Sequence, residues 1–166
     1  MESIIEVKEQ NPKMTMTMEM DISPSVIDEI SITALEGGSN YWLGLPNSEL
    51  EKCRLWFEKS GLKRNNEIHY DFIDAVIQGY DGINIYDNEE LHEAEHEADM
   101  NDEEIDLSDL EPIGKISLDN IMKGLKTAAK KYQWAFNQHV PEYNDGDGTS
   151  ADALFQCMTL NDVLYG

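Results

Sequence analysis

Strict alternation of apolar and polar residues predicts strands in three places. Near the start of the chain, Ile4–Val7 and Met14–Met20 lie on either side of the turn signal Asn11–Pro12, and the second run places a methionine at every other position. This pattern is typical of a hairpin with one apolar face. Apolar residues alternate with polar ones again over residues 68–72 and over residues 83–86. We expect half-buried strands in both.

Helical spacing of apolar residues, bounded by start and stop signals, predicts two helices in the first half of the chain. The first begins at Ser23–Pro24, an N-cap followed by proline at the first helical position, and ends at Gly37–Gly38. The second is capped by Asn47 or Ser48, buries Leu50, Cys53, Trp56 and Phe57, and ends near residue 60, with Gly61 positioned to terminate it.

The second half of the chain predicts two more helices. A long helix capped by Ser117 carries apolar residues on one face as far as Phe136. The loop Pro141–Gly148 follows, and Thr149 or Ser150 caps a last apolar helix. Together the elements predict one α+β domain over residues 1–166, a small antiparallel sheet with helices packed on one face.

One segment does not fit this domain. Asp87–Glu111 holds 13 acidic residues among 25 and no lysine or arginine, so it contributes −13 to the charge. It has few large apolar residues, and glutamates four positions apart repel one another along a helix. We expect a mobile acidic insertion without a packed element of its own.

The composition of the chain limits the classes of partner that it is expected to bind. The 166 residues include 34 acidic and 12 basic ones, a net charge of −22. Such a chain is repelled by phosphate backbones and anionic lipid, so we expect neither nucleic acid nor membrane as a partner. No secretory signal or membrane-spanning run is apparent, which predicts a cytoplasmic protein. Cys53 and Cys157 read as reduced packing residues, and the sequence calls for no cofactor.

The segment His92–His96 matches H-E-x-x-H, in which two histidines at i and i+4 hold zinc and the glutamate activates a water. A zinc peptidase using His92, Glu93 and His96 is therefore one alternative function. The surrounding residues argue against it, because they provide almost no apolar face to bury and the run is nearly a repeat of four residues. A solvated acidic segment is the favoured interpretation.

Three further features have ordinary explanations. Asp145–Gly148 resembles part of a calcium loop, but no register supplies the full set of ligands, which favours a turn. The five cations over residues 115–131 are expected to be neutralised in part by the acidic segment that precedes them. Tyr41 and Trp42, after the glycine pair, are expected to fill the core, with a recognition surface as the alternative.

Two segments carry a family resemblance. Residues 34–42, Ala-Leu-Glu-Gly-Gly-Ser-Asn-Tyr-Trp, and residues 150–156, Ser-Ala-Asp-Ala-Leu-Phe-Gln, followed by Val-Leu-Tyr-Gly at 163–166, resemble a family of small proteins of bacteriophages and other mobile elements. The acidic segment is not covered. The resemblance implies a setting in the cytoplasm of a bacterial host, but no activity and no catalytic residues.

Setting and charge together favour a binding function without catalysis. We expect an inhibitor that presents carboxylates to a basic host protein that normally binds nucleic acid, as DNA-mimicking anti-restriction and anti-CRISPR proteins do. A helical segment would space its charges by about 3 Å, close to the phosphates of one DNA strand. A virion or replication accessory protein is a further alternative, and a homodimer stays open. The predicted contact residues are Glu89, Glu90, Glu93, Glu95, Glu97, Asp99, Asp102, Glu103, Glu104, Asp106 and Asp109.

Overall fold

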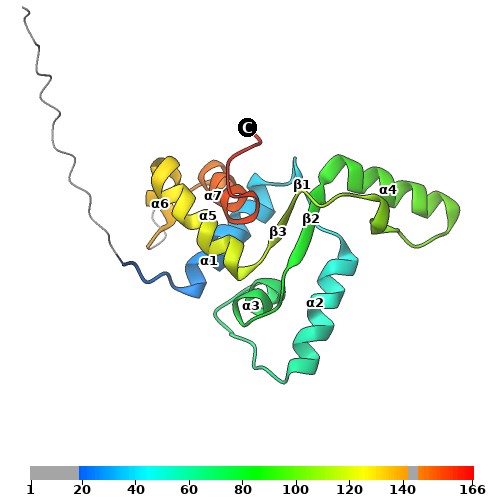
Figure 1. Cartoon of the computed structure of the whole chain (residues 1–166), viewed down its shortest axis with the longest axis horizontal. Helices are drawn as coiled ribbons and strands as arrows, with labels where there is room; N and C mark the ends of the chain where they lie inside the picture. Colours follow the sequence, from blue (N-terminus) through cyan, green and yellow to red (C-terminus); the bar gives the residue numbers. More distant parts are fainter. Residues whose placement is uncertain (1–18, 142–145) are drawn as a thin grey trace, which may run out of the picture.

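The computed structural model describes residues 19–141 and 146–166. Over these residues, helices surround a small three-stranded sheet (Figure 1). The helices are α1 (Pro24–Thr33), the π-helical turn η1 (Ala34–Gly38), α2 (Asn47–Ser60), α3 (Asp71–Ile77), α4 (Asn88–Asn101), the 3₁₀ turn η2 (Leu107–Asp109), α5 (Leu118–Lys131), α6 (Gln133–His139) and α7 (Gly148–Leu160). The strands are β1 (Leu43–Gly44), β2 (Ile83–Asp87) and β3 (Gly114–Ile116).

The sheet is antiparallel, in the order β1-β2-β3. Leu43 pairs with Asp87 at one end of the central strand, and Ile83 pairs with Ile116 at the other. Ile83 and Ile85 are fully buried. The predicted α+β class with a small antiparallel sheet is confirmed, and so is the strand expected over residues 83–86.

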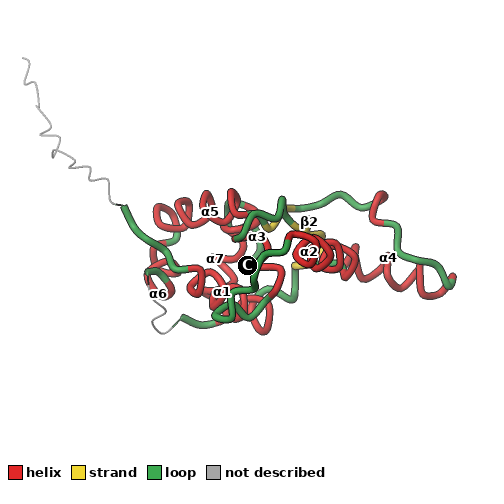
Figure 2. The backbone as a smooth tube through the Cα atoms, turned by 90° about the horizontal axis from the view of Figure 1, so that it is seen from below, coloured by secondary structure: helices red, strands yellow, loops and turns green. Residues whose placement is uncertain are grey.

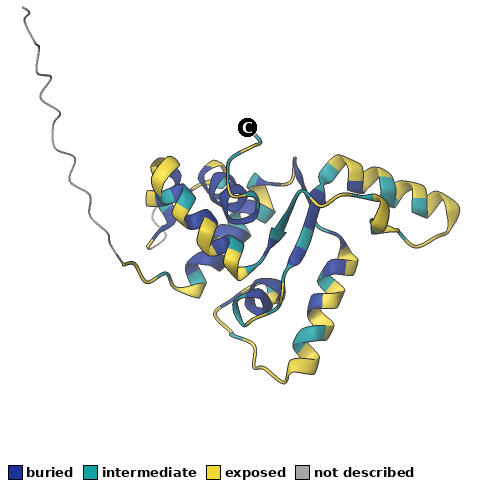
Figure 3. Cartoon of the chain, in the orientation of Figure 1, coloured by how far each residue is buried: buried dark blue, intermediate teal, exposed yellow. Residues whose placement is uncertain are grey.

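The core is centred on α7, which packs most extensively against α5 (Figures 1 and 3). Leu154, Phe155 and Met158 of α7 are fully buried. The two helices approach closely at Gly124, where an added Cβ would lie 1.9 Å from the carbonyl oxygen of Cys157. Only glycine fits at that crossing.

Several predicted helix boundaries are confirmed. The side chain of Ser23 caps α1 by accepting from the Ser25 amide, and Ser117 caps α5 by accepting from the Asn120 amide. Gly61 terminates α2 in the left-handed conformation, with φ of 69°. The start of α2 differs from the prediction, because Pro46 occupies the N-cap position and Asn47 is already helical.

The strand predicted over residues 68–72 is wrong, because the chain makes a turn there and enters α3 at Asp71. The buried carboxylate of Asp28 in α1 accepts from the backbone N–H groups of His69, at 2.7 Å, and Tyr70, at 3.3 Å. These bonds hold the turn against α1. Ile73 and Val76, both fully buried, then continue the apolar pattern at helical spacing.

Two predictions for the C-terminal half also need correction. The long helix ends at Lys131, and α6 begins after Tyr132, whose backbone (φ −127°, ψ 49°) leaves the helical region. The last helix is capped by Asp147, not by Thr149 or Ser150, and Ser150 completes a reciprocal capping box. The predicted hairpin over residues 4–20 falls almost wholly outside the described residues. Within the described ranges, no helix is both long and apolar enough to cross a membrane.

Candidate functional site

The acidic segment begins with a capped helix, α4. The side chain of Asp87 accepts from the amides of Glu89 and Glu90, at 3.0 and 3.1 Å, and glutamates in the first turn favour the positive end of the helix dipole. Leu91 is buried, and α4 packs against β1 and β2. The expectation that this segment has no packed element is therefore wrong, because cap and dipole support the helix that side-chain repulsion opposes. Its mobility stays a prediction.

The helix and the loop that follows it form a hairpin that projects from the rest of the molecule (Figures 1 and 2). Asp102 ends α4 in the left-handed conformation, and the Glu103 amide donates to the Ala98 carbonyl at 2.9 Å. The chain then returns along the helix through η2, which Asp106 caps. We call residues 87–111 the acidic hairpin. Of its eleven predicted contact residues, all are exposed except Glu95, which is half-buried.

The hairpin brings most of these carboxylates around one hollow of about 400 Å³. Ala94, Ala98, Ile105 and Leu110 also line it. The acidic residues that border it come from both arms, Glu90, Glu93 and Glu97 from the helix and Glu103, Glu104, Asp106 and Asp109 from the returning loop. On the side near Ser48, a second hollow gathers Glu95 and Asp99 with Glu103 and Glu104. The structure thus brings together residues that the sequence separates by up to about five turns of helix.

Along its whole length, residues 87–111, the hairpin makes no ion pair with lysine or arginine. Lys115 pairs with Asp81, Lys123 with Asp119 and Lys131 with Asp162. In Figure 1, α5 lies on the opposite side of the sheet from α4. The predicted partial neutralisation of the acidic segment by the basic helix is not supported by any ion pair between them, because the sheet lies between two segments that follow each other closely in sequence.

The histidines of the H-E-x-x-H match, His92 and His96, are both exposed on α4. Among the described residues, no three histidine, cysteine, aspartate or glutamate side chains gather in a geometry that could hold a metal ion. A catalytic zinc site needs a third protein ligand beside the two histidines. The structure therefore supplies no residue set for the zinc peptidase alternative within the ranges it describes.

A second polar site lies in the body of the protein, around the carboxylate of Asp152 on α7. One of its oxygens accepts from Ser39 Oγ and Trp42 Nε1, both at 2.7 Å. The other accepts from Tyr41 Oη at 2.8 Å and Gln156 Nε2 at 3.0 Å. Indole and amide nitrogens can only donate, so the arrangement fits the ionised carboxylate, with its lone pairs filled by four neutral donors.

This network joins residues 34–42 to residues 150–156. Sequence reasoning missed it, since the partners lie 110 or more positions apart. Trp42 is buried as predicted, but Tyr41 is 54% exposed, so the expectation that both fill the core is half wrong. Burial and the hydrogen bond to Asp152 raise the pKa of Tyr41 to about 12.

Gln156 extends the network to the end of the chain. Its Oε1 accepts from the amides of Leu164 and Tyr165, each at 2.8 Å, and its Nε2 donates to the Tyr165 carbonyl at 3.0 Å. The ring of Tyr165 stacks on Trp42 with 5.2 Å between centroids and 9° between planes. Beside the network lies a recess of about 610 Å³, lined by residues that include Gly37, Tyr41, Trp134, Asp147, Asp152 and Tyr165. We call it the Asp152 recess.

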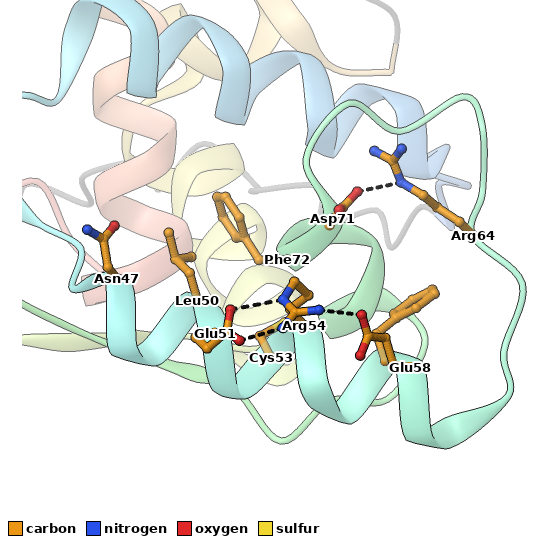
Figure 4. A pocket seen from close by; sticks show the side chains of 10 residues that line it. Asn47, Leu50, Glu51, Cys53, Arg54, Glu58, Arg64, Asp71 and Phe72 are labelled. Atoms are coloured by element: carbon orange, nitrogen blue, oxygen red, sulfur yellow. Dashed lines mark hydrogen bonds and ion pairs between the residues drawn. The ribbon is translucent and has the colours of Figure 1, made fainter.

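A third hollow, of about 570 Å³, lies between α2 and α3 (Figure 4). Leu50, Cys53, Phe57 and Phe72 give it apolar walls. The charged groups at its rim are already paired: Arg54 with Glu51 and Glu58, and Arg64 with Asp71. Burial raises the pKa of Cys53 to about 11, so its thiol is a poor nucleophile at neutral pH. This hollow therefore offers no group poised for chemistry.

No family model, curated protein or solved structure matches the chain.

Proposed function

We propose that the protein is a non-enzymatic binding protein whose acidic hairpin docks on a basic surface of a partner protein. The carrying observation is that the carboxylates of the hairpin have no ion pair with a lysine or arginine along residues 87–111. Like charges held close together raise the energy of the free protein, and a cationic partner relieves that repulsion. The hairpin stands clear of the body, so a partner has access to it (Figure 3).

The finer part of the proposal is that the partner is a host protein that normally binds nucleic acid. In the 14 residues of α4, six carboxylates follow Asn88 over about 21 Å, or about one charge per 3.5 Å. The phosphates of one DNA strand are spaced by about 3.4 Å along the axis. This similarity supports mimicry of a nucleic-acid backbone. A phage or mobile-element protein acting against a host defence protein in the bacterial cytoplasm is the setting that the family resemblance implies.

The test uses two charge-matched variants. In the hairpin variant, glutamine replaces four exposed glutamates of α4: Glu89, Glu90, Glu93 and Glu97. In the control variant, glutamine replaces glutamate and asparagine replaces aspartate at four exposed positions elsewhere that form no ion pair: Glu19, Asp21, Glu29 and Glu67. Both changes raise the net charge by four, so a difference between the variants reports on position and not on total charge.

Each protein is immobilised and exposed to bacterial lysate at about 50 mM and about 500 mM salt, because added salt shortens the range of charge interactions to well below 10 Å. We expect wild type and control variant to retain a nucleic-acid-binding protein at low salt, and the hairpin variant to lose it. The retained protein is then purified and its DNA binding is measured with increasing amounts of wild type. Retention that is equal for both variants, or a partner whose DNA binding is unaffected, would contradict the proposal.

A further inference from the structure

The Asp152 recess combines aromatic surface with negative charge. Tyr41 is 54% exposed and Trp134 is 51% exposed, and both line the recess. Asp147 and Asp152 line it as well, and its lining contains no lysine or arginine. Large aromatic side chains that remain half-exposed around one hollow are typical of the residues that dominate binding energy in protein interfaces.

The charge of Asp152 has no cationic partner within the described residues, although only 8% of this residue is exposed. Its four hydrogen-bond donors, Ser39, Tyr41, Trp42 and Gln156, are all neutral. They orient the carboxylate and fill its lone pairs, but they do not cancel its charge. A cation in the adjacent recess is therefore attracted to it without needing a direct hydrogen bond.

Part of the lining of the recess, at Tyr41, Tyr165 and the η1–α7 contact, is held in place before any ligand arrives. The Tyr41 hydroxyl is fixed by Asp152, and the Tyr165 ring is fixed by stacking on Trp42 and by backbone bonds from its segment to Gln156. The backbone of η1 approaches the first turn of α7 so closely that a Cβ on Gly38 would lie 2.4 Å from the Gly148 carbonyl oxygen. A site formed in advance binds with less loss of conformational freedom.

We propose that the Asp152 recess binds an arginine side chain of a partner protein. A guanidinium is planar and weakly hydrated, so it stacks on the rings of tyrosine and tryptophan while its charge faces the carboxylates. A lysine ammonium is a compact, strongly hydrated charge that makes less use of a flat aromatic wall. The proposal concerns a surface other than the acidic hairpin and stands independently of it.

Three blocked tripeptides test the recess: Gly-Arg-Gly, Gly-Lys-Gly and Gly-citrulline-Gly, of which citrulline has the shape of arginine without its charge. The readout is the set of indole N–H signals in ¹H–¹⁵N NMR spectra. Trp134 lines the recess and Trp42 donates to Asp152, whereas Trp56 packs against Tyr80, with 5.3 Å between ring centroids, and serves as an internal reference. We expect the arginine peptide to shift the Trp134 and Trp42 signals saturably and to leave Trp56 unchanged.

We expect the lysine and citrulline peptides to bind at least roughly fivefold more weakly than the arginine peptide. Trp134→Ala should weaken arginine binding by a similar factor, read from the Trp42 signal, while Leu55→Ala, which truncates an exposed apolar side chain on α2, should not. The four-glutamate variant of α4 should bind the peptide as wild type does.

Three results would overturn the proposal. The first is the absence of a saturable shift with the arginine peptide, and the second is equal binding of the lysine or citrulline peptide. The third is loss of binding in the α4 variant together with full binding by Trp134→Ala, which would place the cation on the acidic hairpin instead. Failure here leaves the lysate experiment on the hairpin unaffected, so the two proposals are separable.

Discussion

The Asp152→Asn substitution should lower the free energy of unfolding more than an Asp→Asn substitution at an exposed position does. The side chain keeps its shape, but one oxygen becomes an NH₂ group that donates. If the NH₂ group faces Trp42 Nε1, two donors oppose each other. If it faces Gln156 Nε2, the glutamine amide would have to flip, and its Oε1 would then lose the amides of Leu164 and Tyr165. Neither orientation satisfies every group.

The size of the effect follows from the four bonds. Hydrogen bonds to a charged group contribute about 1.5–3 kcal/mol each and neutral ones about 0.5–1.5 kcal/mol, while a buried donor left unsatisfied costs about 1–3 kcal/mol. The neutral asparagine offsets part of this loss of stability, because it avoids the desolvation cost of a buried carboxylate. We expect a net loss of about 3 kcal/mol in the free energy of unfolding, a large share of the roughly 5–15 kcal/mol typical of a domain.

Urea unfolding followed by far-UV circular dichroism measures the loss. The control is Asp119→Asn, an exposed aspartate paired with Lys123 at 2.8 Å, which should change stability by less than about 0.5 kcal/mol. Hydrogen exchange at the amides of Leu164 and Tyr165 should also speed up in Asp152→Asn, since Gln156 holds both. An Asp152→Asn protein within about 0.5 kcal/mol of wild type would refute the assignment of this network as a major tie between α7 and the η1–β1 corner.

Three other outcomes are expected. Gly124→Ala should lower the free energy of unfolding in urea by about 3 kcal/mol, because the added Cβ would meet the Cys157 carbonyl. Gly37→Ala, where nothing lies within 4 Å of the added Cβ, should lower it far less. Equal effects would contradict the close α5–α7 crossing. Burial lowers the pKa of His139 below the 6.5 of an unfolded histidine, although the nearby Asp147 carboxylate opposes this shift. On acidification the unfolded chain therefore takes up a proton before the folded protein does. Thermal stability should fall from pH 7 to pH 5, and it should fall less in His139→Gln. Burial also raises the pKa of Cys53 to about 11 and of Cys157 to about 12. Ellman's reagent should therefore modify neither thiol at pH 8 until urea unfolds the protein. Rapid modification of the folded protein would contradict the burial of both thiols.

Local signals predicted the elements that are set by local chemistry. The caps Ser23 and Ser117 and the left-handed Gly61 are interactions within a few residues, and each lies where the sequence places it. The turn before α3 was missed because it depends on Asp28, about 40 positions earlier. The two-residue strand β1 was missed as well, since so short a strand has no periodicity and exists only by pairing with β2.

The candidate sites divide in the same way. Composition alone identified the acidic residues of the hairpin, but it suggested that repulsion would keep them from a regular element, whereas one cap at Asp87 and one buried leucine, Leu91, accompany a helix of 14 residues. The Asp152 network could not be predicted, because nothing in a single sequence pairs Trp42 with a carboxylate 110 positions away. A single sequence likewise does not show that residues 34–42 and 150–156 are in contact.

Trp42 connects the start of the acidic hairpin to the Asp152 carboxylate. Its carbonyl oxygen accepts from the Asn88 amide at 2.9 Å at the start of α4, and its indole donates to Asp152 at 2.7 Å. Carboxylates therefore lie on both sides of one buried residue, and within the described ranges neither the hairpin nor Asp147 and Asp152 form an ion pair with a lysine or arginine. Leaving both groups uncompensated costs self-repulsion, and a cationic partner surface removes that cost at either place.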